Sequence, residues 1–277
     1  MIGQIKFKKA MQQLIHKDSL PRFMIICGPE GHGKRTACRW ISKQLGESFQ
    51  TYTLPDIKVE TVRDMIDMSY KQKTPTLIII PDADLMSLAG KNSLLKVTEE
   101  PPNNAYIIMT LQDINNTLDT IKSRAVVHYM DSYRIEDLKE YFISICPRYT
   151  ERQLDLILKL SLNPGQINKL VASDVEEFYA YTEKVVDNIA KVSGANAFKI
   201  ANKVAIKEDA EGYDIRLFLH MFNQVCLDRL LEDNDRSWEE AISIACEALD
   251  RLRVKGINRQ FVIDKWILEV REAWMFK

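Results

Sequence analysis

The stretch from residue 23 to residue 36 constrains the fold of this chain more than any other. Five apolar residues, Phe23 to Cys27, lead into a loop whose glycines are Gly28, Gly31 and Gly33, and Lys34 then begins an expected helix. The backbone N–H groups of such a loop can surround a phosphate, and the N-terminus of the helix attracts the anion. The spacing G-x-x-x-x-G-K therefore predicts a P-loop within an α/β fold.

The residue after the P-loop lysine departs from this pattern. A Ser or Thr hydroxyl at that position normally binds Mg²⁺, but Arg35 stands here and Thr36 lies one residue further on. Two interpretations stay open for the glycines and Lys34. They bind ATP or ADP without turnover, or the glycines are present because the strand-to-helix turn needs positive φ and close packing.

Composition excludes several classes of protein. Lys and Arg (38) nearly balance Asp and Glu (39), so a nucleic-acid contact must be a local patch or belong to a larger assembly. No apolar run approaches the ~20 residues that span a bilayer, and we expect a cytoplasmic chain with no membrane contact. The five cysteines form no C-x-x-C pair and the four histidines are scattered, so we expect reduced thiols and no metal site.

Strand and helix patterns alternate over the first 130 residues, which predicts a parallel, doubly wound sheet. The expected strands are 23–27, 51–54, 76–80, 105–111 and 126–129. The expected helices are 6–16, 34–45, 59–70 and 85–99, and 118–124 is expected to be a short helix or a turn. After residue 132 the strand signals stop. Helices are expected at 135–145, 151–162, 165–172, 176–192, 197–206, 213–231, 238–252 and 258–274.

Three segments resemble one known family. They are Asn92-Ser-Leu-Leu-Lys-Val-Thr-Glu-Glu-Pro-Pro102, which fits the pattern N-x-L-L-K-x-x-E-E-P-P, then Thr120-Ile-Lys-Ser-Arg124, and finally the stretch 252–258. In this order they resemble the clamp-loader subunits of bacterial DNA polymerase III, which belong to the AAA+ class. The interval between Trp40 and Thr76 contains no cysteine, although bacterial members often carry a zinc module there, so the chain resembles a trimmed form.

The resemblance implies an architecture and a set of partners. It implies an AAA+ core with a P-loop sheet over residues 1–131, a helical lid over 132–173 and an all-α collar over 174–277. It also implies a pentameric ring with clamp-loader ATPase subunits and a delta subunit. Such a ring loads a sliding clamp onto primer–template DNA during replication.

The same resemblance assigns roles around the P-loop. Pro81 takes the place of the Walker B aspartate, Asp82 that of the catalytic glutamate, and Asn168 that of the sensor 2 arginine, while Thr110 keeps the polar sensor 1 position. Because proline has no carboxylate for a metal, these changes argue against ATP hydrolysis by this chain alone. Two alternatives stay open: an active ATPase motor subunit in which Thr36 and Asp82 replace the missing ligands, and a plain scaffold.

Arg124 is the residue to which the resemblance gives a chemical role. In the family, the arginine of the Ser-Arg pair reaches a neighbour's ATP site as an arginine finger, which can be worth ~10³–10⁵ in rate. Ser123 would position the turn that carries Arg124. The alternative is a surface arginine at a helix end that is paired with a carboxylate or only solvated. Lys91 is a candidate contact for a DNA phosphate.

Overall fold

The computed structural model describes residues 1–193, 195–197, 199, 215–252, 254 and 256–275. The chain forms two compact units, the first made of residues 1–141 and 162–165, the second of 142–161 and 166–277. The division into core, lid and collar is finer than these units and stays a prediction. Most of the helix expected at 197–206 lies outside the described residues.

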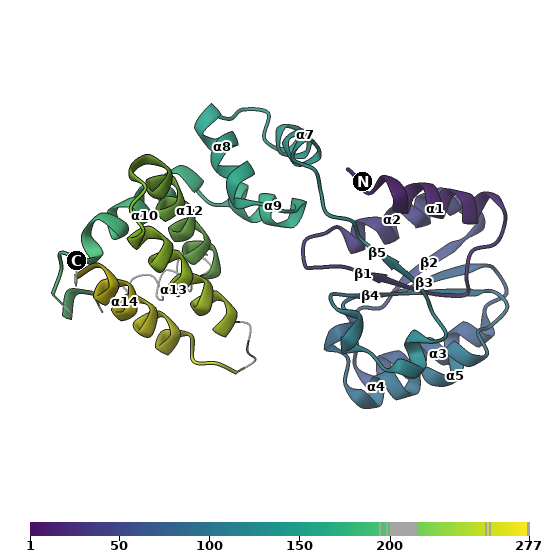
Figure 1. The fold of residues 1–277 in the computed structure, drawn as a ribbon. Helices are drawn as coiled ribbons and strands as arrows, with labels where there is room; N and C mark the ends of the chain where they lie inside the picture. Colours follow the sequence, from purple (N-terminus) through teal and green to yellow (C-terminus); the bar gives the residue numbers. More distant parts are fainter. Residues whose placement is uncertain (194, 198, 200–214, 253, 255, 276–277) are drawn as a thin grey trace. The chain divides into compact units, whose positions relative to one another are not determined.

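A five-stranded parallel sheet forms the centre of the first unit (Figure 1). Its spatial order is β2-β3-β4-β1-β5, and every neighbouring pair is parallel. The strands are β1 (Phe23–Cys27), β2 (Gln50–Thr53), β3 (Thr76–Ile80), β4 (Ala105–Leu111) and β5 (Val126–Tyr129). The predicted α/β class with a helical second half is confirmed, and β2 begins one residue earlier than expected.

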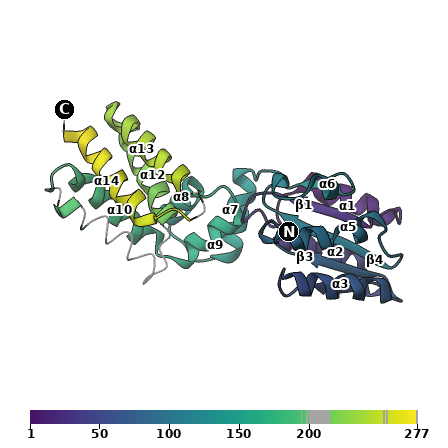
Figure 2. The same ribbon diagram turned by 90° about the horizontal axis from the view of Figure 1, so that it is seen from below.

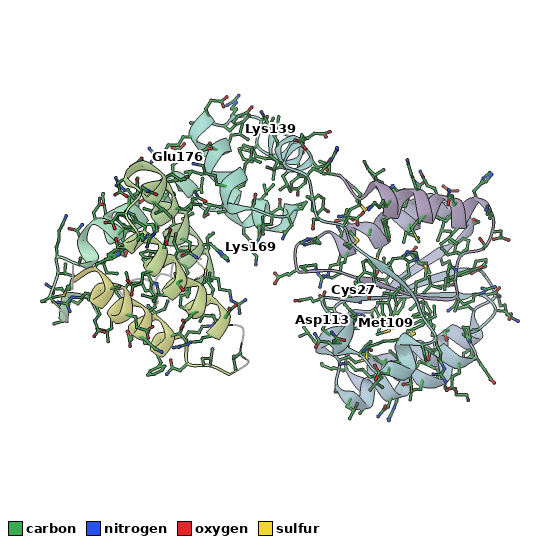
Figure 3. All side chains as sticks on the ribbon, viewed as in Figure 1. Cys27, Met109, Asp113, Lys139, Lys169 and Glu176 are labelled. Atoms are coloured by element: carbon green, nitrogen blue, oxygen red, sulfur yellow. The ribbon has the colours of Figure 1, made fainter. Side chains whose placement is uncertain are left out.

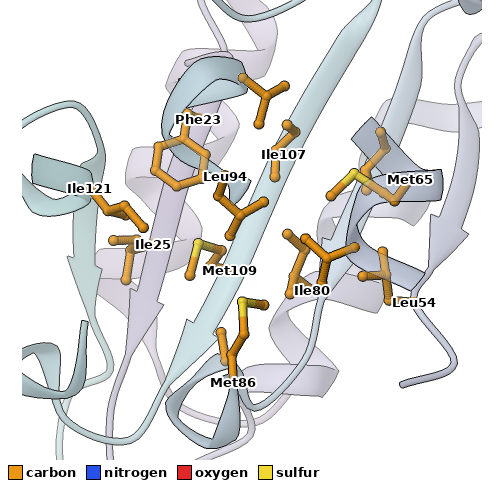
Figure 4. Packing of buried hydrophobic residues seen from close by; sticks show 14 of the residues in the cluster. Phe23, Ile25, Leu54, Met65, Ile80, Met86, Leu94, Ile107, Met109 and Ile121 are labelled. Carbon is orange, nitrogen blue, oxygen red and sulfur yellow. The ribbon is translucent and has the colours of Figure 1, made fainter. Parts of the chain in front are cut away.

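Helices cover both faces of this sheet (Figures 1 and 2). On one face lie α1 (Ile5–His16) and α2 (Lys34–Leu45), and on the other lie α3 (Val59–Lys71), α4 (Leu88–Ser93) and α5 (Leu95–Glu99). Side chains of β1 point alternately into the two cores: Phe23 and Ile25 pack on the α3 side, and Met24 packs on the α1 side. A strand buried on both faces needs apolar residues throughout, which explains its unbroken sequence. Figure 4 shows the core on the α3 side.

The single helix expected over 85–99 is wrong. The chain first makes a short 3₁₀ turn, η2 (Ala83–Leu85), and Met86 and Ser87 are extended. The Ser87 hydroxyl accepts a hydrogen bond from the N–H of Gly90 at 3.2 Å, so it caps a helix that begins at Leu88. A turn at Leu94 then separates α4 from α5. Local capping by Ser87 therefore overrides a pattern that extended over the whole segment.

Three short elements and one side-chain clamp complete the first unit. The turn η3 (Ile114–Asn116) and the helix α6 (Asp119–Lys122) connect β4 to β5, and η1 (Gly46–Ser48) precedes β2. The amide of Gln4 donates to the Asp131 carbonyl at 2.6 Å and accepts from the Asp131 N–H at 2.8 Å. This pair of bonds joins the chain before α1 to the chain after β5.

The remaining elements are helices. They are α7 (Ile135–Ile145), α8 (Glu151–Leu160), α9 (Pro164–Ala172), α10 (Val175–Ile189), α12 (Ile215–Asp233), α13 (Ser237–Arg251) and α14 (Arg259–Met275). Trp266 is buried in the second unit with its ring edge-on to Phe218 and Phe222. The Thr150 hydroxyl caps α8 and also contacts Glu176 of α10, which Figure 3 labels. Helix α8 is thus fixed to the helices that follow it.

Candidate functional site

The P-loop leaves the end of β1 and ends at the first turn of α2. Gly31 has φ +80° and Gly33 has φ +82°, a left-handed conformation that glycine adopts without the strain a Cβ would bring. The Gly33 carbonyl accepts the N–H of Ala37 at 2.8 Å and so closes the first turn of α2. The local geometry is the strand–loop–helix arrangement that the sequence predicts.

Two of the loop glycines face side chains that follow β5. A Cβ at Gly28 would lie 2.8 Å from the Cβ of Met130, and one at Gly33 would lie 3.2 Å from the hydroxyl oxygen of Tyr133. That hydroxyl donates a hydrogen bond to the His32 carbonyl at 3.0 Å, and burial raises the pKa of Tyr133. The space beside these glycines is therefore taken by the chain's own residues.

Gly31 faces the turn before α9, which belongs to the same compact unit as the P-loop. A Cβ at Gly31 would lie 2.2 Å from the Asn163 Oδ1 and 3.1 Å from the Gly165 Cα. The N–H of Gly165 donates to the Gly31 carbonyl at 3.1 Å. A Cβ at Gly165 would lie 2.3 Å from the Gly31 Cα, so both glycines are needed for this close backbone approach.

The P-loop lysine is bonded to its own loop. Its Nζ donates to the carbonyls of Gly28 at 2.5 Å and Pro29 at 3.0 Å, and the side chain is buried. Burial lowers the pKa of Lys34. The next residue, Arg35, makes an ion pair with Asp82. In this arrangement the loop carbonyls accept hydrogen bonds from the ammonium group, and the guanidinium of Arg35 pairs with the carboxylate that follows β3.

The polar groups at the carboxyl edge of β3 and β4 bind backbone. Asp82 has φ +48°, and its N–H donates to the hydroxyl of the buried Thr110 at 2.9 Å. The carboxylate of Asp84 accepts the N–H groups of Gln112 at 2.7 Å and Asp113 at 3.2 Å. Figure 3 labels Asp113 at this edge, together with Cys27 at the end of β1. Thr110 and Asp84 thus fix the loops after β3 and β4.

Arg124 lies just after α6, about one third exposed. Its Nη1 donates to the Thr120 carbonyl at 2.7 Å and to the Ser123 hydroxyl at 3.5 Å, and its Nη2 donates to the Glu99 Oε1 at 2.9 Å. The Ser123 hydroxyl in turn donates to the Thr120 carbonyl at 3.1 Å. A guanidinium held by these contacts keeps a fixed direction at the surface of the first unit.

The remaining predicted site residues are Lys91, Thr36 and Asn168. Lys91 on α4 donates to the Asn116 carbonyl. Thr36 is exposed on α2, and Asn168 lies on α9 within the second unit. Among the described residues, no group of three or more His, Cys, Asp or Glu side chains could hold a metal ion.

Two histidines of the first unit make its stability depend on pH. Burial lowers the pKa of His32, in the P-loop, and of His128, on β5, below the ordinary value of 6.5. The unfolded chain then binds protons at a pH where the folded chain does not, so the free energy of unfolding falls as the pH drops through 6.5. We expect a lower thermal midpoint at pH 5.5 than at 7.5.

A variant with both His32→Gln and His128→Gln should lose most of this slope between pH 7.5 and 5.5. Asp137 does not interfere in that window: the hydrogen bond from Arg134 lowers its pKa below 3.8, so its contribution is lost only at lower pH. Thermal unfolding across pH measures the effect. An equal slope in the wild-type chain and the double variant would contradict it.

Comparisons with known proteins match this fold and these motifs. The family model described as "DNA polymerase III, delta subunit" matches residues 47–133, which hold Asp82, Thr110 and Arg124 and exclude the P-loop. DNA polymerase III subunit delta' of Escherichia coli K12 is 28% identical over 122 residues, covering 40% of this chain and 36% of that protein. Subunit gamma of Buchnera aphidicola is 24% identical over 166 residues, covering 50% and 46%. Over these regions the chain is similar to clamp-loader subunits.

The chain is also similar to an archaeal protein in sequence and to two solved structures in fold. A replication factor C small subunit of Halobacterium salinarum is 23% identical over 137 residues, covering 46% of this chain and 42% of that protein. A DNA polymerase III gamma subunit-related protein of Thermotoga maritima has a TM-score of 0.52 at 16% identity, covering 96% of this chain and 98% of that one. The Thermotoga maritima RuvB Holliday junction branch migration motor has a TM-score of 0.51 at 15% identity, covering 83% and 76%. These structures share the AAA+ fold.

The aligned regions span less than half the length of the first three clamp-loader relatives. Across the described residues, no helix has both the length and the apolar character that crossing a membrane requires.

Sequence reasoning missed three residues that contact the candidate site. Asn163 reaches Gly31, Tyr133 reaches the P-loop carbonyl of His32, and Glu99 pairs with Arg124. Asn163 lies between the helices expected at 151–162 and 165–172, and Glu99 lies within the N-x-L-L-K-x-x-E-E-P-P segment. Neither pattern names a partner, because each contact joins residues far apart in the sequence.

Proposed function

We propose that this chain is a non-hydrolysing subunit of a clamp loader, most similar in role to the delta' subunit. It would sit in a pentameric ring with ATPase subunits and a delta subunit, help load a sliding clamp onto primer–template DNA, and supply Arg124 to a neighbour's ATP site. The chain would act in the cytoplasm, and its own P-loop would need no nucleotide for this role.

One observation carries the proposal. The P-loop is filled from within: Lys34 binds the carbonyls of its own loop, and Asn163 and Gly165 pack against Gly31. The Asp82 carboxylate is paired with Arg35, so it is not available to bind a metal ion or to orient a water molecule. A loop used in this way supports a structural role for the glycines, and it leaves Arg124 as the group suited to act on phosphate.

The proposal is tested by reconstitution with purified clamp-loader ATPase subunits. We expect the chain to co-elute with them from a sizing column and to raise the DNA- and clamp-dependent ATP turnover of the ring. The isolated chain should hydrolyse no ATP above a blank. Turnover by the isolated chain that Lys34→Ala abolishes would instead identify an active motor subunit, and failure to join the ring would identify a scaffold outside it.

A further inference from the structure

A carboxylate of this chain lies next to the proposed arginine finger. Glu99 is the last residue of α5, and its Oε1 accepts the Nη2–H of Arg124 at 2.9 Å. Its side chain is about half exposed and that of Arg124 about one third, so water reaches the pair. We propose that Glu99 is a positioning residue that orients the Arg124 guanidinium toward the neighbouring subunit. The inference rests on the proposed function.

The backbone on both sides of the pair is rigidly held. Leu94 of the α4–α5 turn and Ile121 of α6 are both fully buried in the core on the α3 side (Figure 4). Val97 of α5 is buried in the same core. Helix α5 ends at Glu99, two residues before Pro101, which cannot continue a helix. Glu99 therefore lies on a helix whose position is fixed by packing. A residue that orients another side chain needs such a fixed backbone.

The hydrogen bonds around Arg124 leave part of the guanidinium for another anion. Arginine has five N–H donors in a planar fork. Bonds to the Thr120 carbonyl, the Ser123 hydroxyl and Glu99 use three of them, so two remain to bind phosphate oxygens. Two acceptors on different elements, one on α6 and one on α5, define the plane of the fork. The Thr120 and Ser123 acceptors both bind Nη1, so removing Glu99 takes away the contact that holds Nη2.

The size of the effect follows from the exposure of the pair. Ion pairs in contact with water contribute up to about 1 kcal/mol, which corresponds to about fivefold in rate. An orienting contact to a group that acts in the transition state changes kcat and leaves KM unaltered. We therefore expect Glu99→Ala to lower the kcat for ATP turnover at the neighbouring site by three- to fivefold. Glu99→Gln keeps an acceptor oxygen, so its kcat should lie between those of the wild-type chain and Glu99→Ala.

The experiment uses the reconstituted ring and a double-mutant cycle. Glu99→Ala and Glu100→Ala, the adjacent carboxylate as matched control, are each measured alone, and Glu99→Ala is also measured in an Arg124→Ala background. The inference requires a fall of at least twofold in kcat for Glu99→Ala alone, with unchanged KM, unchanged ring assembly and no further effect without Arg124. A smaller fall, a rise, a change confined to KM, or an equal loss in Glu100→Ala overturns it.

The same data separate this inference from the proposed function. If Arg124→Ala itself leaves turnover unchanged, the arginine-finger role fails and the positioning role fails with it. If Arg124→Ala lowers turnover and Glu99→Ala does not, the finger stands and the positioning role alone is overturned.

Discussion

Replacing Arg124 with alanine is expected to lower ATP hydrolysis at the neighbouring subunit's site by at least about 100-fold, because an arginine finger in trans is worth ~10³–10⁵. In the proposed role the guanidinium would stabilise negative charge that builds on the transferring phosphoryl group, and alanine offers nothing in its place. The measurement is single-turnover hydrolysis in a reconstituted ring in which the other ATPase sites are silenced. Total turnover of an unmodified ring would show a smaller fall, because the other sites continue to work.

Two further variants make the Arg124 result specific. Arg124→Lys keeps the charge and loses the planar fork, so we expect a loss close to that of alanine. Arg152→Ala removes another surface arginine, which lies 3.6 Å from one carboxylate, that of Glu183, and it should leave turnover unchanged. Equal turnover in the wild-type ring and the Arg124→Ala ring would contradict the finger assignment, provided that both rings assemble to the same extent.

Adding a methyl group at Gly31 or Gly165 is expected to have the largest effect on the stability of the P-loop. A Cβ at Gly165 would lie 2.3 Å from the Gly31 Cα, and one at Gly31 would lie 2.2 Å from the Asn163 Oδ1. Backbone cannot yield as a flexible side chain does, so Gly165→Ala should cost about 1–3 kcal/mol. Gly31→Ala should cost about 1–2 kcal/mol more, because its φ of +80° also strains an alanine.

Gly46→Ala is the matched control for this pair. Gly46 has a positive φ of +71°, and a Cβ there would meet nothing within 4 Å, so its substitution measures backbone strain alone. Hydrogen exchange of residues 28–34 measures the local stability of the P-loop, whereas a thermal melt of the whole chain would average over both units. Protection of the loop should fall most in Gly31→Ala, less in Gly165→Ala and least in Gly46→Ala. Equal protection in Gly165→Ala and the wild-type chain would show that the turn before α9 does not hold the P-loop.

Local sequence patterns were enough to predict most of the first unit. Continuous apolar runs predict β1, β3 and β4 with their observed bounds, and Gly46 predicts the end of α2. These predictions succeed because burial on both sheet faces and a glycine after a helix act over a few residues. The prediction of one helix over 85–99 was wrong because Ser87 caps a helix that begins at Leu88. Residue types alone do not show whether such a cap outweighs an apolar pattern that continues across it.

The sequence by itself determined the class of fold, the place of the P-loop and the identity of the arginine after α6. The tertiary structure decided what these residues touch. It brought Asn163 and Gly165 to Gly31 across more than 130 residues, closed Lys34 onto its own loop, and placed Glu99 beside Arg124. The physical reason is that a residue type specifies which partners are possible, whereas the packing of helices on the sheet selects the one that lies within hydrogen-bonding distance.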